Sequence, residues 1–127
     1  MIVFVVHPRK NKLQSLSVKL PRNIKICDPL GYLDMVRLMR DAKAVLTDSG
    51  GLQKEAYWIG KPCITLRDET EWTETVQVGW NVLVGCDSDK IIAAVKNPVI
   101  PPNSPCLYGG DGKAAERIIS IISNKCI

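Results

Sequence analysis

The sequence predicts an α/β protein built on a parallel sheet with helices on both faces. Short segments rich in β-branched residues alternate along the chain with longer segments whose apolar residues recur at helical spacing. Such alternation is typical of parallel sheets, because each return to the same edge needs a crossover helix. Polar or glycine-rich residues follow every expected strand, which predicts a binding site at the carboxyl edge of the sheet.

Five strands are expected, each bounded by turn-forming or charged residues: residues 2–6, 24–27, 44–47, 63–66 and 81–84. Six helices are expected between and after them: residues 10–20, 32–41, 52–59, 71–78, 87–95 and 112–122. In the second helix, Leu33, Val36 and Met39 recur at helical spacing and predict an apolar face. Residues 97–105 are rich in proline and asparagine, which predicts an irregular linker.

The composition is that of a globular protein. Apolar residues make up 46% of the chain and charged residues 24%, which argues against disorder. The net charge of +4 is spread along the chain, so it suits an anionic ligand and gives little support to nucleic-acid binding. No apolar run approaches the about 18 residues of a membrane span, and residues 2–6 are too few for a signal-peptide core.

Five cysteines occur singly, without the spacing of a zinc site or a disulfide framework: Cys27, Cys63, Cys86, Cys106 and Cys126. Their odd number favours reduced thiols, so we expect no bound metal and a cytoplasmic protein. Cys27 and Cys63 lie in apolar strand patterns and are expected to be small buried side chains. The single histidine, His7, is remote from them in sequence, which disfavours a cysteine–histidine hydrolase.

A glycine-rich turn between an expected strand and helix predicts a phosphate site. The turn contains Ser49, Gly50 and Gly51, and unpaired N–H groups at the start of such a helix attract anions. A Cβ at either glycine would clash with an approaching anion or forbid a positive φ. We expect Asp48 to turn away and cap a backbone amide, and Glu55 to accept hydrogen bonds from a ribose diol. An ordinary βα turn without a ligand is the alternative.

Five sequence blocks occur in the order and spacing of one enzyme family. They are HPRK (7–10), DPLGYLDMVRLM (28–39), LTDSGGLQKEA (46–56), GKPCITLRDETEWTE (60–74) and GDGKAAERI (110–118). Together they make residues 2–122 resemble the C-terminal half of non-hydrolysing UDP-N-acetylglucosamine 2-epimerases. The EWTE variant at residues 71–74 resembles the branch that acts on UDP-diacetamido-glucuronic acid, whereas the main branch more often reads ERPE.

The resemblance implies a three-layer Rossmann-like fold that is one half of a glycosyltransferase-B-like two-domain architecture. A chain of 127 residues is long enough for one such domain, so residues 1–127 are expected to form a single nucleotide-binding domain without the N-terminal catalytic half. Family members invert C2 of a UDP-sugar by anti elimination of UDP and re-addition, without a cofactor. Because the N-terminal catalytic half is missing, we expect this chain alone to be inactive. The resemblance also implies that the full-length enzyme is a homodimer.

The resemblance also assigns site residues, none of them catalytic and none a metal ligand. The UDP-binding residues it implies are Leu30, Met35, Ser49, Gly50, Gly51 and Glu55. The residues it implies on the sugar side are His7, Arg67, Thr70, Glu71 and Trp72.

Several of these positions depart from the family or have a structural alternative. Met35 stands where many relatives carry Phe, and Trp72 stands where the main branch carries a substrate-contacting Arg. Trp72 and Trp80 are also candidates for the core, and Arg67 for a local ion pair with the acidic residues that follow it. The loop at Tyr108 is shifted by an extra glycine relative to the family, so the resemblance assigns no ligand contact to Tyr108.

Two other functions fit the same residues. One is the C-terminal domain of a glycosyltransferase of the same architecture, which also binds UDP-sugars with a glutamate on the ribose; the LRDETE block favours the epimerase. The other is a UDP-sugar-binding module, or a subunit that pairs with a separate N-terminal half.

Overall fold

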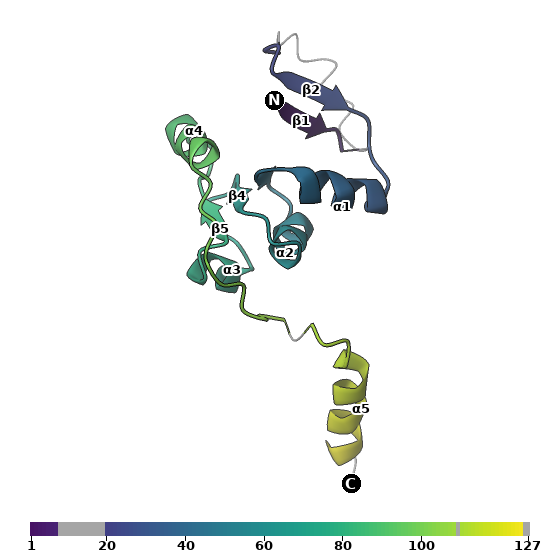
Figure 1. Cartoon of the computed structure of the whole chain (residues 1–127). Coiled ribbons are helices and arrows are strands. Elements are labelled where there is room, and N and C mark those ends of the chain that lie inside the picture. Colours follow the sequence, from purple (N-terminus) through teal and green to yellow (C-terminus); the bar gives the residue numbers. More distant parts are fainter. Residues whose placement is uncertain (8–19, 109, 126–127) are drawn as a thin grey trace. The chain divides into compact units, whose positions relative to one another are not determined.

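The structure of the chain is a computed structural model that describes residues 1–7, 20–108 and 110–125. It forms two compact units, residues 1–38 and 39–127, and parallel strands occur in both (Figure 1). The predicted α/β class is therefore confirmed. The helix expected at residues 10–20 lies outside the described residues except for Leu20, which is in no helix or strand.

The first unit contains strands β1 (Ile2–Val5) and β2 (Ile24–Cys27), which pair in parallel with Val5 opposite Cys27. The Val6 N–H donates to the Cys27 carbonyl over 3.0 Å, so both strands end at the same edge. Helix α1 (Tyr32–Asp41) begins in this unit, with Asp34 in its first turn and a basic residue in its last, as the helix dipole favours.

The second unit contains three parallel strands in the order β3-β4-β5: β3 (Val45–Thr47), β4 (Cys63–Thr65) and β5 (Asn81–Leu83). Thr47, Thr65 and Leu83 are aligned, so the three strands end at one edge. All three residues of β4 are buried although neighbouring side chains point to opposite faces, so both faces of the central strand are covered.

Four helices follow strands of this unit or end it: α2 (Gly50–Trp58), α3 (Thr73–Gln77), α4 (Ser88–Lys96) and α5 (Ala114–Lys125). Both α2 and α4 contact β4. Helix α4 is capped by Asp87, whose carboxylate accepts the N–H groups of Asp89 and Lys90 over 2.9 and 3.0 Å. The prediction of a core tryptophan is confirmed for Trp80, which is 6% exposed and donates its indole N–H to the Asn103 carbonyl.

The described strands differ from the single five-stranded sheet that the pattern suggested. Their hydrogen bonds form one sheet of two strands in the first unit and one of three in the second. Periodicity marks where strands occur, but their neighbours are selected by side-chain packing between segments distant in sequence. The assignment of residues 1–127 to one nucleotide-binding domain stays a prediction.

Candidate functional site

The turn between β3 and α2 leaves the start of a helix without a side-chain cap. The Ser49 N–H donates to the Thr47 hydroxyl over 3.0 Å, and Ser49 is extended, with φ −85° and ψ 125°, before α2 begins at Gly50. The Ser49 hydroxyl makes no capping hydrogen bond. The turn therefore presents helix N–H groups and a free hydroxyl, which is the donor set that an anion needs.

The expectation that Asp48 caps a backbone amide is wrong. Among the described residues, the Thr47 hydroxyl and not the Asp48 carboxylate accepts the backbone amide of this turn. Thr47 at the end of the strand lies two residues before Ser49 and already accepts its N–H, so that donor is not left for Asp48. The Asp48 side chain is exposed instead, and its charge contributes to the raised pKa of Arg67.

Gly50 is required for a close approach to the segment that follows β4. A Cβ on Gly50 would lie 3.2 Å from Trp72 Nε1 and 3.6 Å from Glu71 Oε2, whereas one on Gly51 would make only an ordinary contact at 3.8 Å with Ser49 Oγ. Neither glycine has a positive φ, so that part of the expectation is wrong. The first turn of α2 and the segment carrying Trp72 thus form one surface.

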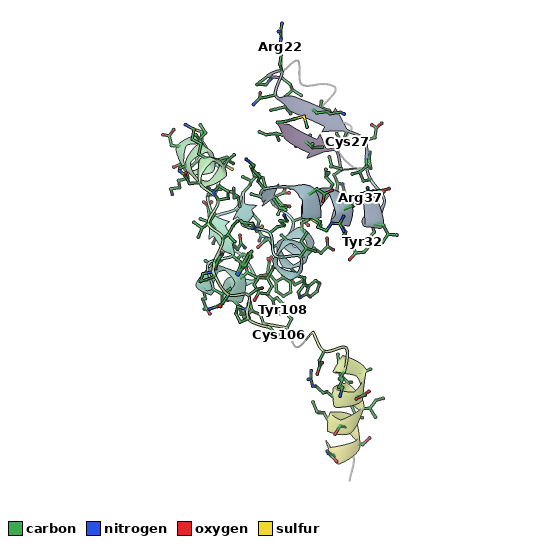
Figure 2. All side chains as sticks on the ribbon, in the orientation of Figure 1. Arg22, Cys27, Tyr32, Arg37, Cys106 and Tyr108 are labelled. Atoms are coloured by element: carbon green, nitrogen blue, oxygen red, sulfur yellow. The ribbon has the colours of Figure 1, made fainter. Side chains whose placement is uncertain are left out.

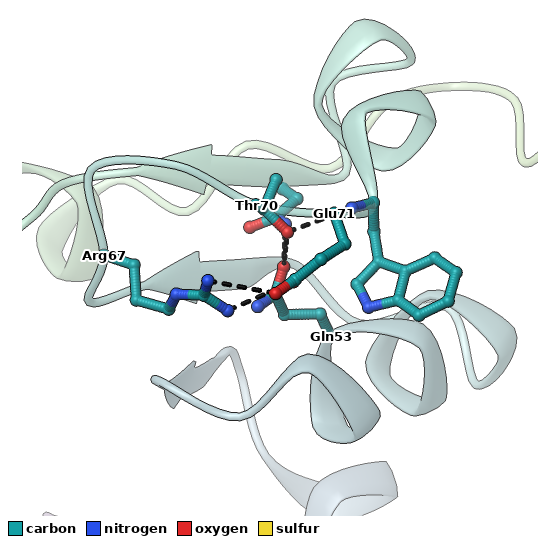
Figure 3. A network of polar contacts seen from close by, with 6 residues as sticks. Gln53, Arg67, Thr70 and Glu71 are labelled. Atoms are coloured by element: carbon teal, nitrogen blue, oxygen red, sulfur yellow. Dashed lines mark hydrogen bonds and ion pairs between the residues drawn. The ribbon is translucent and has the colours of Figure 1, made fainter.

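We call residues 67–72 the sugar-side loop. Arg67 donates two hydrogen bonds to the Glu71 carboxylate, over 3.1 and 3.0 Å (Figure 3). These bonds lower the pKa of Glu71 and raise the pKa of Arg67, so both groups stay charged. The predicted local ion pair of Arg67 is confirmed, and Glu71 is its partner.

The sugar-side loop is hydrogen-bonded to the segment that follows β5. The Gly85 N–H donates to the Arg67 carbonyl over 3.2 Å, and Gly85 has a φ of +58°. L side chains rarely adopt this φ, which favours glycine there, and a Cβ would also displace the Asp68 carboxylate. The predicted gathering of polar residues at the carboxyl edge is confirmed for these three strands.

Aromatic side chains cover the other side of Trp72. Tyr108, labelled in Figure 2, packs edge to face on Trp72, Trp58 and Tyr57, with ring centroids 6.0 to 6.1 Å apart. Lys54 Nζ lies 3.9 Å from the centroid of the Trp72 ring, within cation–π range. Burial raises the pKa of Tyr108, and its hydroxyl has no partner among the described residues. Trp72 is half-buried, so this last residue of the sugar-side loop is packed on one side and exposed in part.

Glu55 and three residues of the first unit complete the predicted set. Glu55 is half-buried on α2, one turn after the glycines, and its carboxylate makes no hydrogen bond with the described residues. His7 is exposed just beyond β1, while Leu30 and Met35 are half-buried beside and within the first turn of α1. The binding roles of all of these residues stay predictions.

Sequence reasoning missed four buried polar residues behind the sugar-side loop: Gln53, Thr65, Thr75 and Asn81. The Thr70 hydroxyl reaches this group, because it donates to Gln53 Oε1 over 2.6 Å. The sequence did carry a signal for these four residues. Each is a polar residue inside an expected strand or helix, at a position where the periodic pattern would place an apolar one.

Within the described ranges, no three His, Cys, Asp or Glu side chains are grouped as metal ligands would be. Helices long and apolar enough to cross a membrane are likewise absent from this part of the chain.

The fold and the edge described above define a parallel α/β protein with a glycine-rich turn between β3, an edge strand of its sheet, and helix α2. The family model for UDP-N-acetylglucosamine 2-epimerase matches residues 1–123, so the chain belongs to that family.

Individual relatives agree with this assignment. The chain is 43% identical over 127 residues to the UDP-N-acetylglucosamine 2-epimerase of Methanocaldococcus jannaschii, with 96% of this chain and 35% of the relative covered. It is 42% identical over 125 residues to the UDP-2,3-diacetamido-2,3-dideoxy-D-glucuronate 2-epimerase of Pseudomonas aeruginosa, with 96% and 34% covered.

Solved structures give the same result. The crystal structure of the M. jannaschii UDP-GlcNAc 2-epimerase in complex with UDP-GlcNAc and UDP matches with a TM-score of 0.79 and 44% identity, and 97% of this chain and 35% of that chain are covered. The chain thus spans about a third of the length of the relatives it matches.

Proposed function

We propose that this chain is the UDP-binding part of a UDP-sugar 2-epimerase, which inverts C2 by anti elimination of UDP and re-addition. The observation that carries the proposal is the uncapped start of α2, which faces the charged sugar-side loop at one edge of the sheet. Support also comes from the M. jannaschii relative, whose structure was determined with UDP-GlcNAc and UDP.

In this proposal the chain holds the leaving-group end of the substrate. The N–H groups at Gly50 and Gly51 and the Ser49 hydroxyl bind the diphosphate and stabilise its charge as the C1–O bond breaks. Glu55 accepts hydrogen bonds from the ribose. Leu30 and Met35 bind uracil, and the residues that border the sugar are His7, Arg67, Thr70, Glu71 and Trp72.

The acid and base groups at C2 would come from an N-terminal domain or a second subunit, since the chain spans only a third of its relatives. The chain alone should then show no 2-epimerase activity, which is checked by incubating it with UDP-GlcNAc and separating the C2 epimers. Turnover would mean that this part carries catalytic groups of its own. We place the whole enzyme, as a homodimer, in the cytoplasm, where its five scattered cysteines would stay reduced.

Binding of UDP tests the proposal directly. The chain should bind UDP weakly, and Glu55→Ala should weaken binding by roughly 1–3 kcal/mol because charge-assisted bonds to the ribose are lost. Glu116→Ala on the exposed surface of α5 is the matched control and should leave affinity unchanged. Isothermal titration calorimetry with no UDP binding by the wild type would overturn the function, and equal affinity of Glu55→Ala would overturn the ribose assignment.

For the sugar, we propose UDP-2,3-diacetamido-glucuronate over UDP-N-acetylglucosamine. An indole at position 72 adds an apolar wall and removes a fixed charge from the loop that would border the sugar. The proposal rests on Trp72, because relatives of both kinds are similar to the chain to nearly the same degree, 42% and 43% identical.

A further inference from the structure

A buried hydrogen-bond network lies between α2 and β5. Its four members are each at most 4% exposed: Gln53, Thr65, Thr75 and Asn81. The Thr65 hydroxyl donates to Asn81 Oδ1 over 2.7 Å. Asn81 Nδ2 then donates to Gln53 Oε1 over 3.0 Å and to Thr75 Oγ1 over 3.2 Å.

In this network the side-chain oxygen of Gln53 faces both Asn81 and Thr70. Because the Asn81 oxygen is used by Thr65, the Asn81 nitrogen faces Gln53 and needs an acceptor there. Gln53 Oε1 is that acceptor, and it also accepts the Thr70 hydroxyl over 2.6 Å. The Thr70 oxygen in turn accepts the Trp72 N–H over 3.1 Å, which extends the chain of bonds into the sugar-side loop (Figure 3).

Gln53 also belongs to the turn at the start of α2. Its backbone N–H donates to the Ser49 carbonyl over 3.3 Å. A single residue therefore bonds to the turn through its backbone and to the sugar-side loop through its side chain.

Core packing alone does not account for a glutamine here. Gln53 is 0% exposed, and its Nε2 is buried without a partner among the described residues. A buried donor left unpaired lowers stability, and an apolar residue of similar volume would avoid that loss. The side chain is therefore better explained by what it positions than by the stability it adds.

We propose that Gln53 is a positioning residue that holds the sugar-side loop against the first turn of α2 and so gives the site its preference for a UDP-sugar over UDP. The inference rests on the proposed function. Through Thr70, the side-chain oxygen of Gln53 holds the backbone on either side of Glu71, whereas the side chain makes no hydrogen bond to the described residues of the turn.

The test compares UDP and UDP-GlcNAc binding to the 127-residue chain by calorimetry, in the wild type and in Gln53→Met. Methionine nearly keeps the volume of glutamine and removes both the amide oxygen and the amide nitrogen. The variant should keep its UDP affinity within about twofold and lose about fivefold to tenfold in UDP-GlcNAc affinity, as expected for one buried hydrogen bond. Gln77→Met, an exposed glutamine at the end of α3, is the matched control.

Thr70→Val removes the hydrogen bond between Thr70 and Gln53 from its other end, at the half-buried Thr70. This variant replaces Gln53→Met in the test if Gln53→Met does not fold. It should show the same selective loss, and the double variant should lose no more than either single one. An unchanged ratio of the two affinities, or an equal loss for both ligands, overturns the inference. A wild type that binds UDP and UDP-GlcNAc equally also overturns it while UDP binding stands, whereas a wild type that binds neither overturns the proposed function.

Discussion

Replacing Gly50 with alanine should destabilise the protein, although alanine is the better helix former. The new Cβ would lie 3.2 Å from Trp72 Nε1, closer than an ordinary van der Waals contact, so the indole would have to move by a few tenths of an ångström. That movement is opposed, because Tyr108 packs on the indole ring and Lys54 lies 3.9 Å from its centroid.

The size of the effect follows from two opposing terms. Overpacking of this kind costs about 1–3 kcal/mol, and exchanging glycine for alanine in a helix returns up to about 1 kcal/mol. Gly51→Ala gains the same helix propensity without the steric clash, since its Cβ would meet only Ser49 Oγ at 3.8 Å. The difference between the two variants therefore isolates the steric term, and Gly50→Ala should be less stable than Gly51→Ala by about 1–3 kcal/mol.

Urea denaturation followed by circular dichroism measures both variants, with equal m-values as the check on two-state unfolding. In a Trp72→Phe background the indole nitrogen is gone, so Gly50→Ala should cost clearly less there. Equal stability of Gly50→Ala and Gly51→Ala would refute the close approach of the sugar-side loop to α2.

Three further predictions concern other parts of the second unit and the whole enzyme. Burial raises the pKa of Cys63 to about 11, so iodoacetamide at pH 8 should label the exposed Cys86 and Cys106 while Cys63 stays unmodified by mass spectrometry; rapid labelling of Cys63 in the folded protein would contradict its burial. Hydrogen bonds from the backbone of α4 lower the pKa of Asp87, so its stabilising effect is complete above the ordinary carboxyl pKa and is lost as the pH falls through the lowered value. Asp87→Ala should lower the melting temperature by roughly 3 °C at pH 7 and by less in acid, and an equal drop at both pH values would argue against the cap. Finally, the full-length enzyme should epimerise UDP-2,3-diacetamido-glucuronate with about 10- to 200-fold higher kcat/KM than UDP-N-acetylglucosamine because of Trp72, and the reverse preference would return it to the main branch.

Local sequence patterns predicted the parts of this protein that depend on neighbours in the chain. Alternating segments located the five described strands, and the positions of turn residues located the polar edge after β3, β4 and β5. The acidic run after Arg67 predicted its ion pair, since Glu71 is only four residues away. Such features are readable because strand propensity, turn chemistry and short-range charge pairing act over a few residues.

Features that join distant segments were not readable in this way. The bond between Asn81 and Gln53 links residues 28 apart in the chain, and the hydrogen bond from the Tyr57 hydroxyl to the Pro105 carbonyl links residues 48 apart. The division of the strands into two sheets and the contact of Gly50 with the sugar-side loop arise in the same manner. Each depends on which surfaces pack together in the folded chain, and a pattern of residue types along the sequence carries no record of those pairings.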